Sequence, residues 1–189
     1  MGWDLALLEA ITTHRTGWVT TLARGLMGAG QPAATYLAAA ALAGAFAWVF
    51  RAWRAVAAAM LASVVATAVA EYAKEFIARP RPPADLALVP TDGFAMPSSI
   101  GALTAGAATP LILWALRSGH RAAGAIIVVL TAGTLLVGAS MVYLGAHWLS
   151  DVVVGWLLGA AMGSGAFLLL DRGAARTGER FGRAGNRRA

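Results

Sequence analysis

The sequence predicts an all-α integral membrane protein, built as a bundle of about five transmembrane helices preceded by N-terminal amphipathic surface helices. Two observations carry this prediction. Of the 189 residues, 59% are hydrophobic and only 13% are charged, whereas a soluble domain carries roughly 25% charged residues. The apolar residues also gather in runs close to the roughly 20 residues that a helix needs to cross the hydrocarbon core of a bilayer.

Five apolar runs are the expected membrane spans. They cover residues 33–50, 55–78, 99–116, 122–143 and 148–170. Residues 33–170 then form one helical bundle inside a single membrane domain of residues 1–170. The chain contains no cysteine, which excludes disulfides and thiolate metal sites.

Residues 1–32 are expected to be an amphipathic surface segment. Charged side chains interrupt its apolar pattern, while Trp18, Leu22 and Leu26 recur at helical spacing. Such a pattern is typical of helices that lie in the membrane interface. The alternative is a sixth, poorly hydrophobic span. Asp4 stands where a signal peptide would carry basic residues, so no cleavable signal is expected.

Arginines predict the orientation of the bundle. If five spans alternate, one side of the membrane holds Arg51, Arg54, Arg117, Arg121 and the arginine-rich tail 171–189. By the positive-inside rule this side is cytoplasmic, and the tail is expected to fray into solvent there. The opposite face, with the loop 79–98 and the turn 143–147, is then periplasmic or extracellular. The preference for arginine over lysine indicates a GC-rich bacterial genome, and hence a bacterial plasma (inner) membrane.

Cationic side chains gather where the second expected span ends. Lys74, the only lysine of the chain, lies in the last turns of that span, and Arg79 and Arg81 each precede a proline. Ionisable groups at this depth are costly and are candidates for function. Because proline disfavours helical geometry in the residue before it, both arginines should be extended and restrained. Such a rim suits a phosphate, although a helix cap or a lipid-headgroup anchor has the same pattern.

A histidine and an aspartate lie four residues apart at the start of the last expected span. In this position His147 and Asp151 should share one helix face. The carboxylate could accept the proton on one imidazole nitrogen and leave the other nitrogen as a nucleophile. The same pair is also common as a helix cap or packing pair.

Three segments together, K74-x6-R81-P82, P97-S98 and S140-x6-H147-x3-D151, resemble the three signature motifs of the type 2 phosphatidic acid phosphatase family, part of the lipid phosphate phosphatase and haloperoxidase-like superfamily. The resemblance runs from about residue 33 to 170. It implies that Lys74, Arg81, Ser98 and Ser99 bind phosphate. It also implies that His147 attacks phosphorus to form a phosphohistidine, that Asp151 orients His147, and that no metal or other cofactor is needed.

Two positions depart from the family pattern. Ile100 stands where the second motif usually has the histidine that protonates the leaving group, and Met141 stands where the third motif usually has a phosphate-binding arginine. A general acid contributes about 10²–10⁴ in rate, and a charge-stabilising donor about 10²–10³. Natural specialisation, decay or deliberate substitution would all produce this pattern.

Two functions therefore stay open. The first is a lipid-phosphate phosphatase with weakened or restricted activity, acting on a polyprenyl diphosphate or phosphate or on a phospholipid phosphate. A diphosphate is favoured because its leaving group is a phosphate with a pKa of roughly 6, whereas a monoester expels an alkoxide. The second is a pseudophosphatase that binds or carries phosphorylated lipid, or serves as a partner subunit.

The expected partners are the lipid bilayer and a phosphorylated lipid, with no nucleic acid. Gly155, Gly159 and Gly163 form a G-x3-G-x3-G face on the last span. This pattern predicts close helix packing, within the bundle or, alternatively, in a homo-oligomer through that span.

Overall fold

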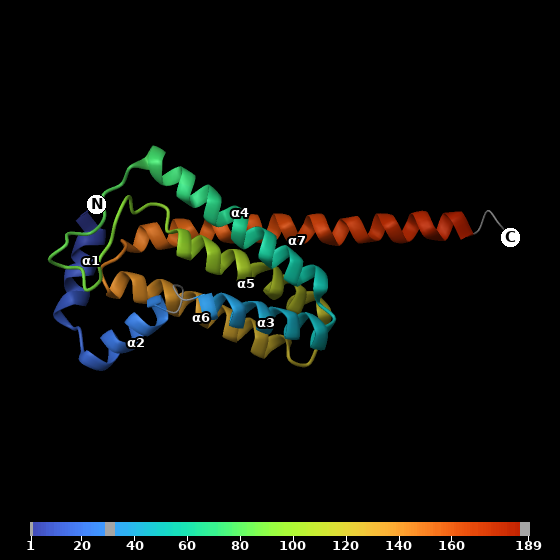
Figure 1. The fold of residues 1–189 in the computed structure, drawn as a ribbon, viewed down its shortest axis with the longest axis horizontal. Coiled ribbons are helices and arrows are strands. Elements are labelled where there is room, and N and C mark those ends of the chain that lie inside the picture. Colours follow the sequence, from blue (N-terminus) through green and yellow to red (C-terminus); the bar gives the residue numbers. More distant parts are fainter. Residues whose placement is uncertain (1, 29–32, 186–189) are drawn as a thin grey trace.

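Seven helices form the part of the chain that the structure, a computed structural model, describes: residues 2–28 and 33–185, with side chains for 2–28 and 37–171 (Figure 1). In chain order these are α1 (Gly2–Thr13), α2 (Gly17–Gly28), α3 (Ala33–Phe50), α4 (Trp53–Ile77), α5 (Ser99–Ser118), α6 (Ala123–Tyr143) and α7 (Leu149–Gly185). No β-strand occurs within these ranges. The predicted all-α fold class is confirmed.

The first two helices are short and lie at one end of the bundle, beside the loop between α4 and α5 (Figure 1). Each has 12 residues and is therefore about 18 Å long, well below the roughly 30 Å of hydrocarbon core. Neither crosses a bilayer alone. The geometry agrees with surface helices rather than with a sixth span.

Four helices are long and apolar enough to cross a membrane. They are Trp53–Ile77, Ser99–Ser118, Ala123–Tyr143 and the Leu149–Asp171 part of α7. The first expected span corresponds to α3, whose described apolar part, Leu37–Phe50, is shorter than the other four. The protein is thus a multi-pass membrane protein whose helices match the expected spans to within a few residues.

The C-terminal tail differs from its expected conformation. It was expected to fray after residue 170, but α7 continues without a break to Gly185, and Figure 1 shows this helix extending beyond the other helices of the bundle. The tail contains no proline, and its alanines and arginines are strong helix formers. Residues 186–189 lie outside the described part.

The centre of the bundle is the contact between α5 and α7, and α4 packs against both. The glycine face of α7 makes this contact close, because a Cβ atom at Gly155 would collide with the backbone oxygen of Ser98, and one at Gly159 with the backbone oxygen of Ala102. The expected packing within the bundle is therefore present. The homo-oligomer stays a prediction, and the glycine face that suggested it is occupied by α5.

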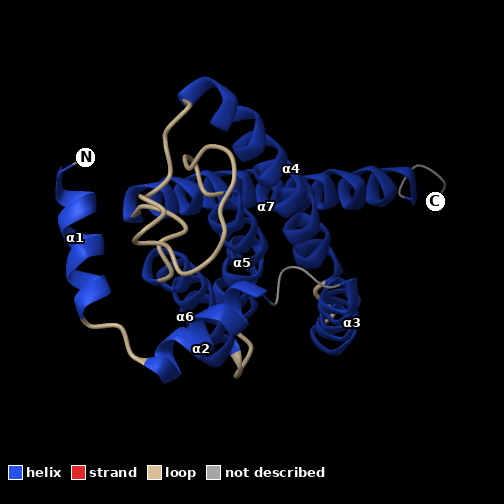
Figure 2. Cartoon of the chain, turned by 60° about the vertical axis from the view of Figure 1, so that its left-hand side comes forward, coloured by secondary structure: helices blue, strands red, loops and turns tan. Residues whose placement is uncertain are grey.

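The loop between α4 and α5 folds over the end of the bundle (Figure 2). Backbone bonds hold it there: the amide of Leu88 donates to the carbonyl of Leu144 at 2.8 Å, and the amide of Ala95 donates to the carbonyl of Arg79 at 2.9 Å. The indole of Trp148 also donates to the carbonyl of Pro80 at 3.0 Å. These bonds join the ends of α4, α6 and α7 into one surface.

We predict that Gly159→Ala destabilises the bundle by about 1–3 kcal/mol, because its methyl group must push α5 away from α7. The matched control is Gly165→Ala on the same helix, where an added Cβ meets nothing within 4 Å. The control should be neutral or slightly stabilising, since alanine favours a helix over glycine. Thermal unfolding of both variants in detergent measures the difference, and equal melting temperatures would contradict the close packing.

Candidate functional site

The first part of the site lies where α4 ends. The helix stops at Ala78, whose backbone is left-handed (φ 48°) and whose amide caps the carbonyl of Lys74 at 2.8 Å. The buried Lys74 ammonium donates to the Glu71 carboxylate at 2.9 Å and to the Ser99 hydroxyl at 3.1 Å. Lys74 thus links α4 to the first turn of α5.

Arg81 and His147 meet at the centre of the site. The Arg81 guanidinium donates to the carbonyl of Ala146 at 2.8 Å, and its Nη1 lies 3.2 Å from Nε2 of His147. Because a guanidinium can only donate, Nε2 must be the accepting, unprotonated nitrogen. A neutral His147 then carries its proton on Nδ1 and keeps the lone pair of Nε2 on the side of Arg81.

Asp151 lies on the other side of the imidazole ring. Its Oδ2 is 3.5 Å from Nδ1 of His147 and accepts the backbone amide of Trp148 at 2.9 Å. The Nδ1 atom is buried and has no hydrogen bond in the structure, so Asp151 is the acceptor toward which its proton points. His147 was expected on the helix itself, but it lies two residues before α7 begins.

Ser98 connects α5 to this pair. It is the N-cap of α5, where its hydroxyl accepts the amide of Gly101 at 3.3 Å, and its own amide donates to the carbonyl of Asp151 at 3.0 Å. The side chain is fully buried. The structure therefore brings the six predicted site residues together: Lys74, Arg81, Ser98, Ser99, His147 and Asp151.

Two further charged residues belong to this cluster and were not among the predicted site residues. Arg79 donates to Oδ1 of Asp151 at 2.6 Å and to Oδ2 of Asp4 at 2.8 Å. Asp4 also accepts from the amide of Ser150 at 3.2 Å and from its hydroxyl at 2.6 Å. The sequence indicates Arg79 only as part of the cationic rim, and Asp4 only as an acidic residue where a signal peptide would carry basic ones.

The pKa of Asp4 is below its ordinary value. Burial acts to raise it, but the hydrogen bonds from Ser150 and Arg79 favour the charged carboxylate and outweigh the burial. Asp4 therefore contributes a negative charge to the cluster.

The two departures from the motif pattern, Ile100 and Met141, pack into one apolar cluster. Met141 is fully buried together with Val142 and Val152, and Ile100 packs against this group. The Met141 sulfur is 3.6 Å from the Ser98 hydroxyl, so the cluster borders Ser98 directly. Apolar side chains occupy this side of the site.

The cations of the site differ in how their charge is balanced. Lys74 is paired with Glu71, and Arg79 with Asp4 and Asp151. The hydrogen bonds of Arg81 go instead to neutral groups: the carbonyls of Asp92 and Ala146, and the imidazole of His147. Of these three cations, Arg81 is the one whose side chain makes no hydrogen bond to a carboxylate, and it lies next to Nε2 of His147.

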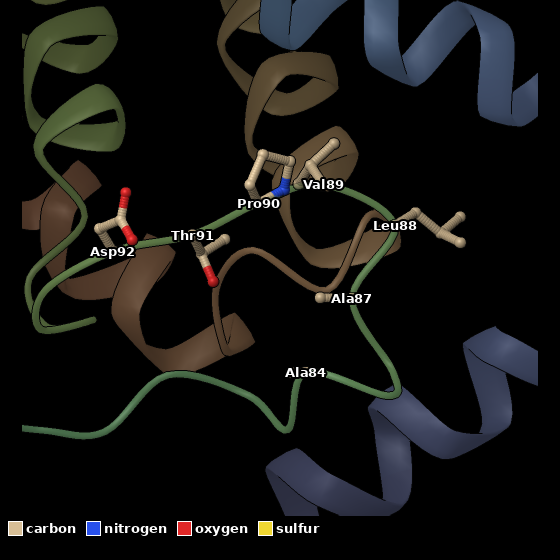
Figure 3. A pocket seen from close by; sticks show the side chains of 7 residues that line it. All are labelled: Ala84, Ala87, Leu88, Val89, Pro90, Thr91 and Asp92. Atoms are coloured by element: carbon tan, nitrogen blue, oxygen red, sulfur yellow. The ribbon is translucent and has the colours of Figure 1, made fainter.

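A cavity of about 460 Å³ lies in the loop between α4 and α5, lined by residues from Ala84 to Asp92. Figure 3 shows its wall formed by short and apolar side chains, with Asp92 at one end. The backbone carbonyl of Asp92 accepts a hydrogen bond from Nε of Arg81 at 2.9 Å, so this end of the cavity adjoins the site. A second cavity, of about 440 Å³, lies among Arg51, Arg54 and Arg117 at the other end of the helices.

In the part of the chain with described side chains, His, Asp and Glu residues form no group of three or more that could hold a metal ion. The cluster brings together the cations of Lys74, Arg79 and Arg81, the carboxylate of Asp151 and the imidazole of His147. The imidazole is held as a neutral base whose Nε2 lone pair accepts a hydrogen bond from Arg81.

The environment of His147 keeps its pKa below the ordinary value. Burial disfavours the charged imidazolium and is the largest cause; the positive charge of Arg81 acts in the same direction, while Asp151 opposes both. The ring is consequently neutral at neutral pH. A neutral imidazole is the form that can act as a nucleophile.

Comparisons with known proteins identify a family and similar folds. Residues 51–173 match the family model of the PAP2 superfamily. No significant match was found among curated proteins. Among similar solved structures are two crystal structures of bacterial proteins. One is the first transmembrane PAP2 type phosphatidylglycerolphosphate phosphatase from Bacillus subtilis, with a TM-score of 0.73 and 24% identity over 93% of this chain and 86% of that chain. The other is Aquifex aeolicus LpxE, with a TM-score of 0.67 and 25% identity over 86% of this chain and 93% of that chain.

We predict that His147 titrates below its ordinary pKa of 6.5 in an NMR titration of the folded protein. The folded state then binds fewer protons at this ring than the unfolded chain does. The free energy of unfolding should therefore fall as the pH decreases from the unfolded pKa toward the folded one. The loss is about 1.4 kcal/mol for each pH unit between the two pKa values.

His147→Gln should remove this part of the pH dependence of stability. The control is His120→Gln, which changes an exposed histidine at the other end of the bundle and should leave the dependence in place. A His147 that titrates above 6.5 would contradict the environment described here.

Proposed function

The chain belongs to the PAP2 superfamily, whose model covers residues 51–173, and we propose that it is a membrane lipid-phosphate phosphatase that acts through a phosphohistidine at His147. The observation that carries this proposal is the line from Arg81 through His147 to Asp151, in which Nε2 faces the guanidinium at 3.2 Å and Nδ1 faces the carboxylate at 3.5 Å. This is the arrangement that a nucleophilic imidazole requires.

In the proposed reaction, Nε2 of His147 attacks the phosphorus atom of the substrate. A bond between nitrogen and phosphorus forms as the bond from phosphorus to the leaving oxygen breaks. Arg81, Lys74 and the hydroxyls of Ser98 and Ser99 stabilise the phosphoryl oxygens, and Asp151 stabilises the imidazolium. Water then attacks the phosphohistidine, releasing inorganic phosphate and restoring the neutral ring.

The proposed substrate is a lipid diphosphate rather than a monoester. Ile100 packs in an apolar cluster and cannot donate a proton to a leaving group. A phosphate leaving group, with a pKa of roughly 6, departs without such help, whereas an alkoxide, close to the pKa of about 15.7 of water, does not. Activity on phosphate monoesters is accordingly proposed to be weak.

The proposed site faces the periplasm or the exterior of a bacterial plasma membrane, and the end of α7 lies in the cytoplasm. This orientation rests on the positive-inside rule, since Arg51, Arg54 and Arg117 lie at the end of the helices opposite to the site.

A second function, a pseudophosphatase that binds or carries phosphorylated lipid or acts as a partner subunit, is favoured by one observation. Met141 is fully buried and packs in the same cluster as Ile100. Both positions that depart from the motif pattern thus have apolar neighbours, and the phosphate-binding residues could hold a lipid phosphate without turnover.

We predict that the purified protein releases phosphate from a prenyl diphosphate faster than from a prenyl phosphate or phosphatidate by at least about 10². His147→Ala should abolish the release, and His120→Ala should not change it. In sealed right-side-out vesicles, the phosphate should appear outside. Binding of prenyl diphosphate without any release would contradict the enzyme and support the pseudophosphatase, while equal rates on all three lipids would mean that another group donates the proton.

We also predict that the double variant Ile100→His/Met141→Arg gains activity on monoesters, because the two changes add a proton donor and a cation beside Ser98 and His147. Each single change should help less, since both groups act on the same transition state. The added arginine enters an apolar cluster, at a cost of about 2.5–3.5 kcal/mol on insertion scales, so thermal unfolding should accompany each assay.

The matched control for this double variant is Ile100→Gln/Met141→Gln, which introduces polar groups without an acid or a charge. It should not gain activity. His147→Ala in the double variant should abolish the gain. A folded double variant that releases no phosphate from any lipid phosphate would count against a latent catalytic site.

A further inference from the structure

Arg79 joins two carboxylates that are far apart in the sequence. One amino group of its guanidinium donates to Oδ1 of Asp151 on α7, and the other to Oδ2 of Asp4 on α1. All three groups are removed from water: the side chain of Arg79 is 10% exposed, that of Asp4 is 3% exposed and that of Asp151 is fully buried. A planar guanidinium can bind two carboxylates in this way, whereas an ammonium is a point charge.

The contacts divide the two oxygens of Asp151 between different partners. Oδ1 binds Arg79, while Oδ2 accepts the amide of Trp148 and faces Nδ1 of His147. Rotation of the carboxylate would break the bond to Arg79. The position of Oδ2 beside His147 therefore depends on where the guanidinium is held.

Asp4 in turn holds the guanidinium. Its Oδ2 accepts hydrogen bonds from the Arg79 guanidinium and from the Ser150 hydroxyl, and its Oδ1 accepts one from the Ser150 amide. Ser150 lies between Trp148 and Asp151 in the first turn of α7, so α1 is fastened to the same turn that carries Asp151.

The inner face of α1 is turned toward the protein. Asp4 and Leu8, one helical turn apart, are both buried, and Leu8 packs against Ala95 and Trp148. Trp3, in contrast, is 58% exposed. A helix that served only as a membrane-surface anchor would direct its carboxylate to water.

We infer that Asp4 and Arg79 are positioning residues of the active site: Asp4 holds Arg79, and Arg79 holds the Asp151 carboxylate so that Oδ2 faces His147. The N-terminal helix α1 is then part of the site. This inference rests on the proposed function, because it gives Asp151 the role of orienting a nucleophilic His147.

The activity test uses the full-length protein with Asp4→Asn, Arg79→Gln, Arg79→Lys and the double variant Asp4→Asn/Arg79→Gln. The matched control is Glu9→Gln, which removes a charge from an exposed position of the same helix. With prenyl diphosphate as substrate, Asp4→Asn and Arg79→Gln should each lower kcat by about 10–100-fold, as substitutions of orienting partners do elsewhere. KM should change less than about threefold.

Two comparisons separate positioning from a general loss of structure. Because Asp4 acts through Arg79, the double variant should be no slower than Arg79→Gln alone, whereas independent structural effects would multiply. Arg79→Lys should stay impaired although it keeps the charge. Wild-type kcat in Asp4→Asn, or an equal fall in Glu9→Gln, would overturn the inference.

An NMR readout makes the inference independent of turnover. His147 is faced by Asp151 from α7, Arg81 from the loop and Lys74 from α4. The contact with Asp151 acts to raise the pKa of His147. Without Arg79 the carboxylate is no longer held at Nδ1, so Arg79→Gln should lower the pKa of His147 further. Arg79→Gln and Asp4→Asn should both speed the exchange of the Nδ1 proton with water.

A failure of the proposed function can be distinguished from a failure of this inference. If the wild-type protein releases no phosphate from any lipid, the proposed function is contradicted, and the NMR data alone test whether Asp4 and Arg79 position Asp151. An unchanged His147 pKa in Arg79→Gln, together with unchanged exchange of the Nδ1 proton in both variants, would overturn it.

Discussion

The close approach of α5 and α7 is the constraint on which the rest of the structure depends. Gly155 lies against the backbone oxygen of Ser98, and one turn earlier on α7 the carbonyl of Asp151 accepts the amide of Ser98 at 3.0 Å. The site residues at the start of α5 and those at the start of α7 thus lie at the point where the two helices touch. A side chain at this contact would separate Ser98 from Asp151. The same glycines that stabilise the bundle therefore also define the distance between Ser98 and the Asp151–His147 pair.

The sequence predicted the helices, and the residues that it marked as a candidate site lie close together in the structure. Apolar runs of this length predict membrane-spanning helices, because in a bilayer every backbone polar group must be hydrogen-bonded within its own helix. The candidate site residues were predicted separately, because the spacing of Lys74, Arg81, His147 and Asp151 resembles a known motif. The partnership of Asp4 with Arg79 could not be predicted, since it joins residues 75 positions apart without any local pattern. The helical course of the tail was missed because its composition, rich in arginine and glycine, is also typical of disordered segments.

Ile100 and Met141, the two positions expected to depart from the motif pattern, are neighbours in the structure. Ile100 packs against the cluster that contains Met141 and Val152, so these positions share one volume. A charged group at either position alone would have apolar neighbours and would lose its solvation. An apolar residue at one position thus favours an apolar residue at the other. Together, Ile100 and Met141 make one wall of the site, the cluster with Val142 and Val152, apolar.

The distribution of charge indicates how a phosphate would be accommodated beside that apolar wall. Arg81 is bound to neutral groups and can attract an anion directly, but one guanidinium does not neutralise a phosphate group of about −1.5 to −2 charges. Arg79 is committed to two buried carboxylates and is not free to help. Lys74 is different, because the side chain of its partner Glu71 is 56% exposed while that of Lys74 is 10% exposed. Glu71 can turn into water at little cost, since exposed ion pairs contribute only about 0–1 kcal/mol. In the proposed reaction Lys74 would then supply the second positive charge, which the ion pair with Glu71 at 2.9 Å holds in place in the structure.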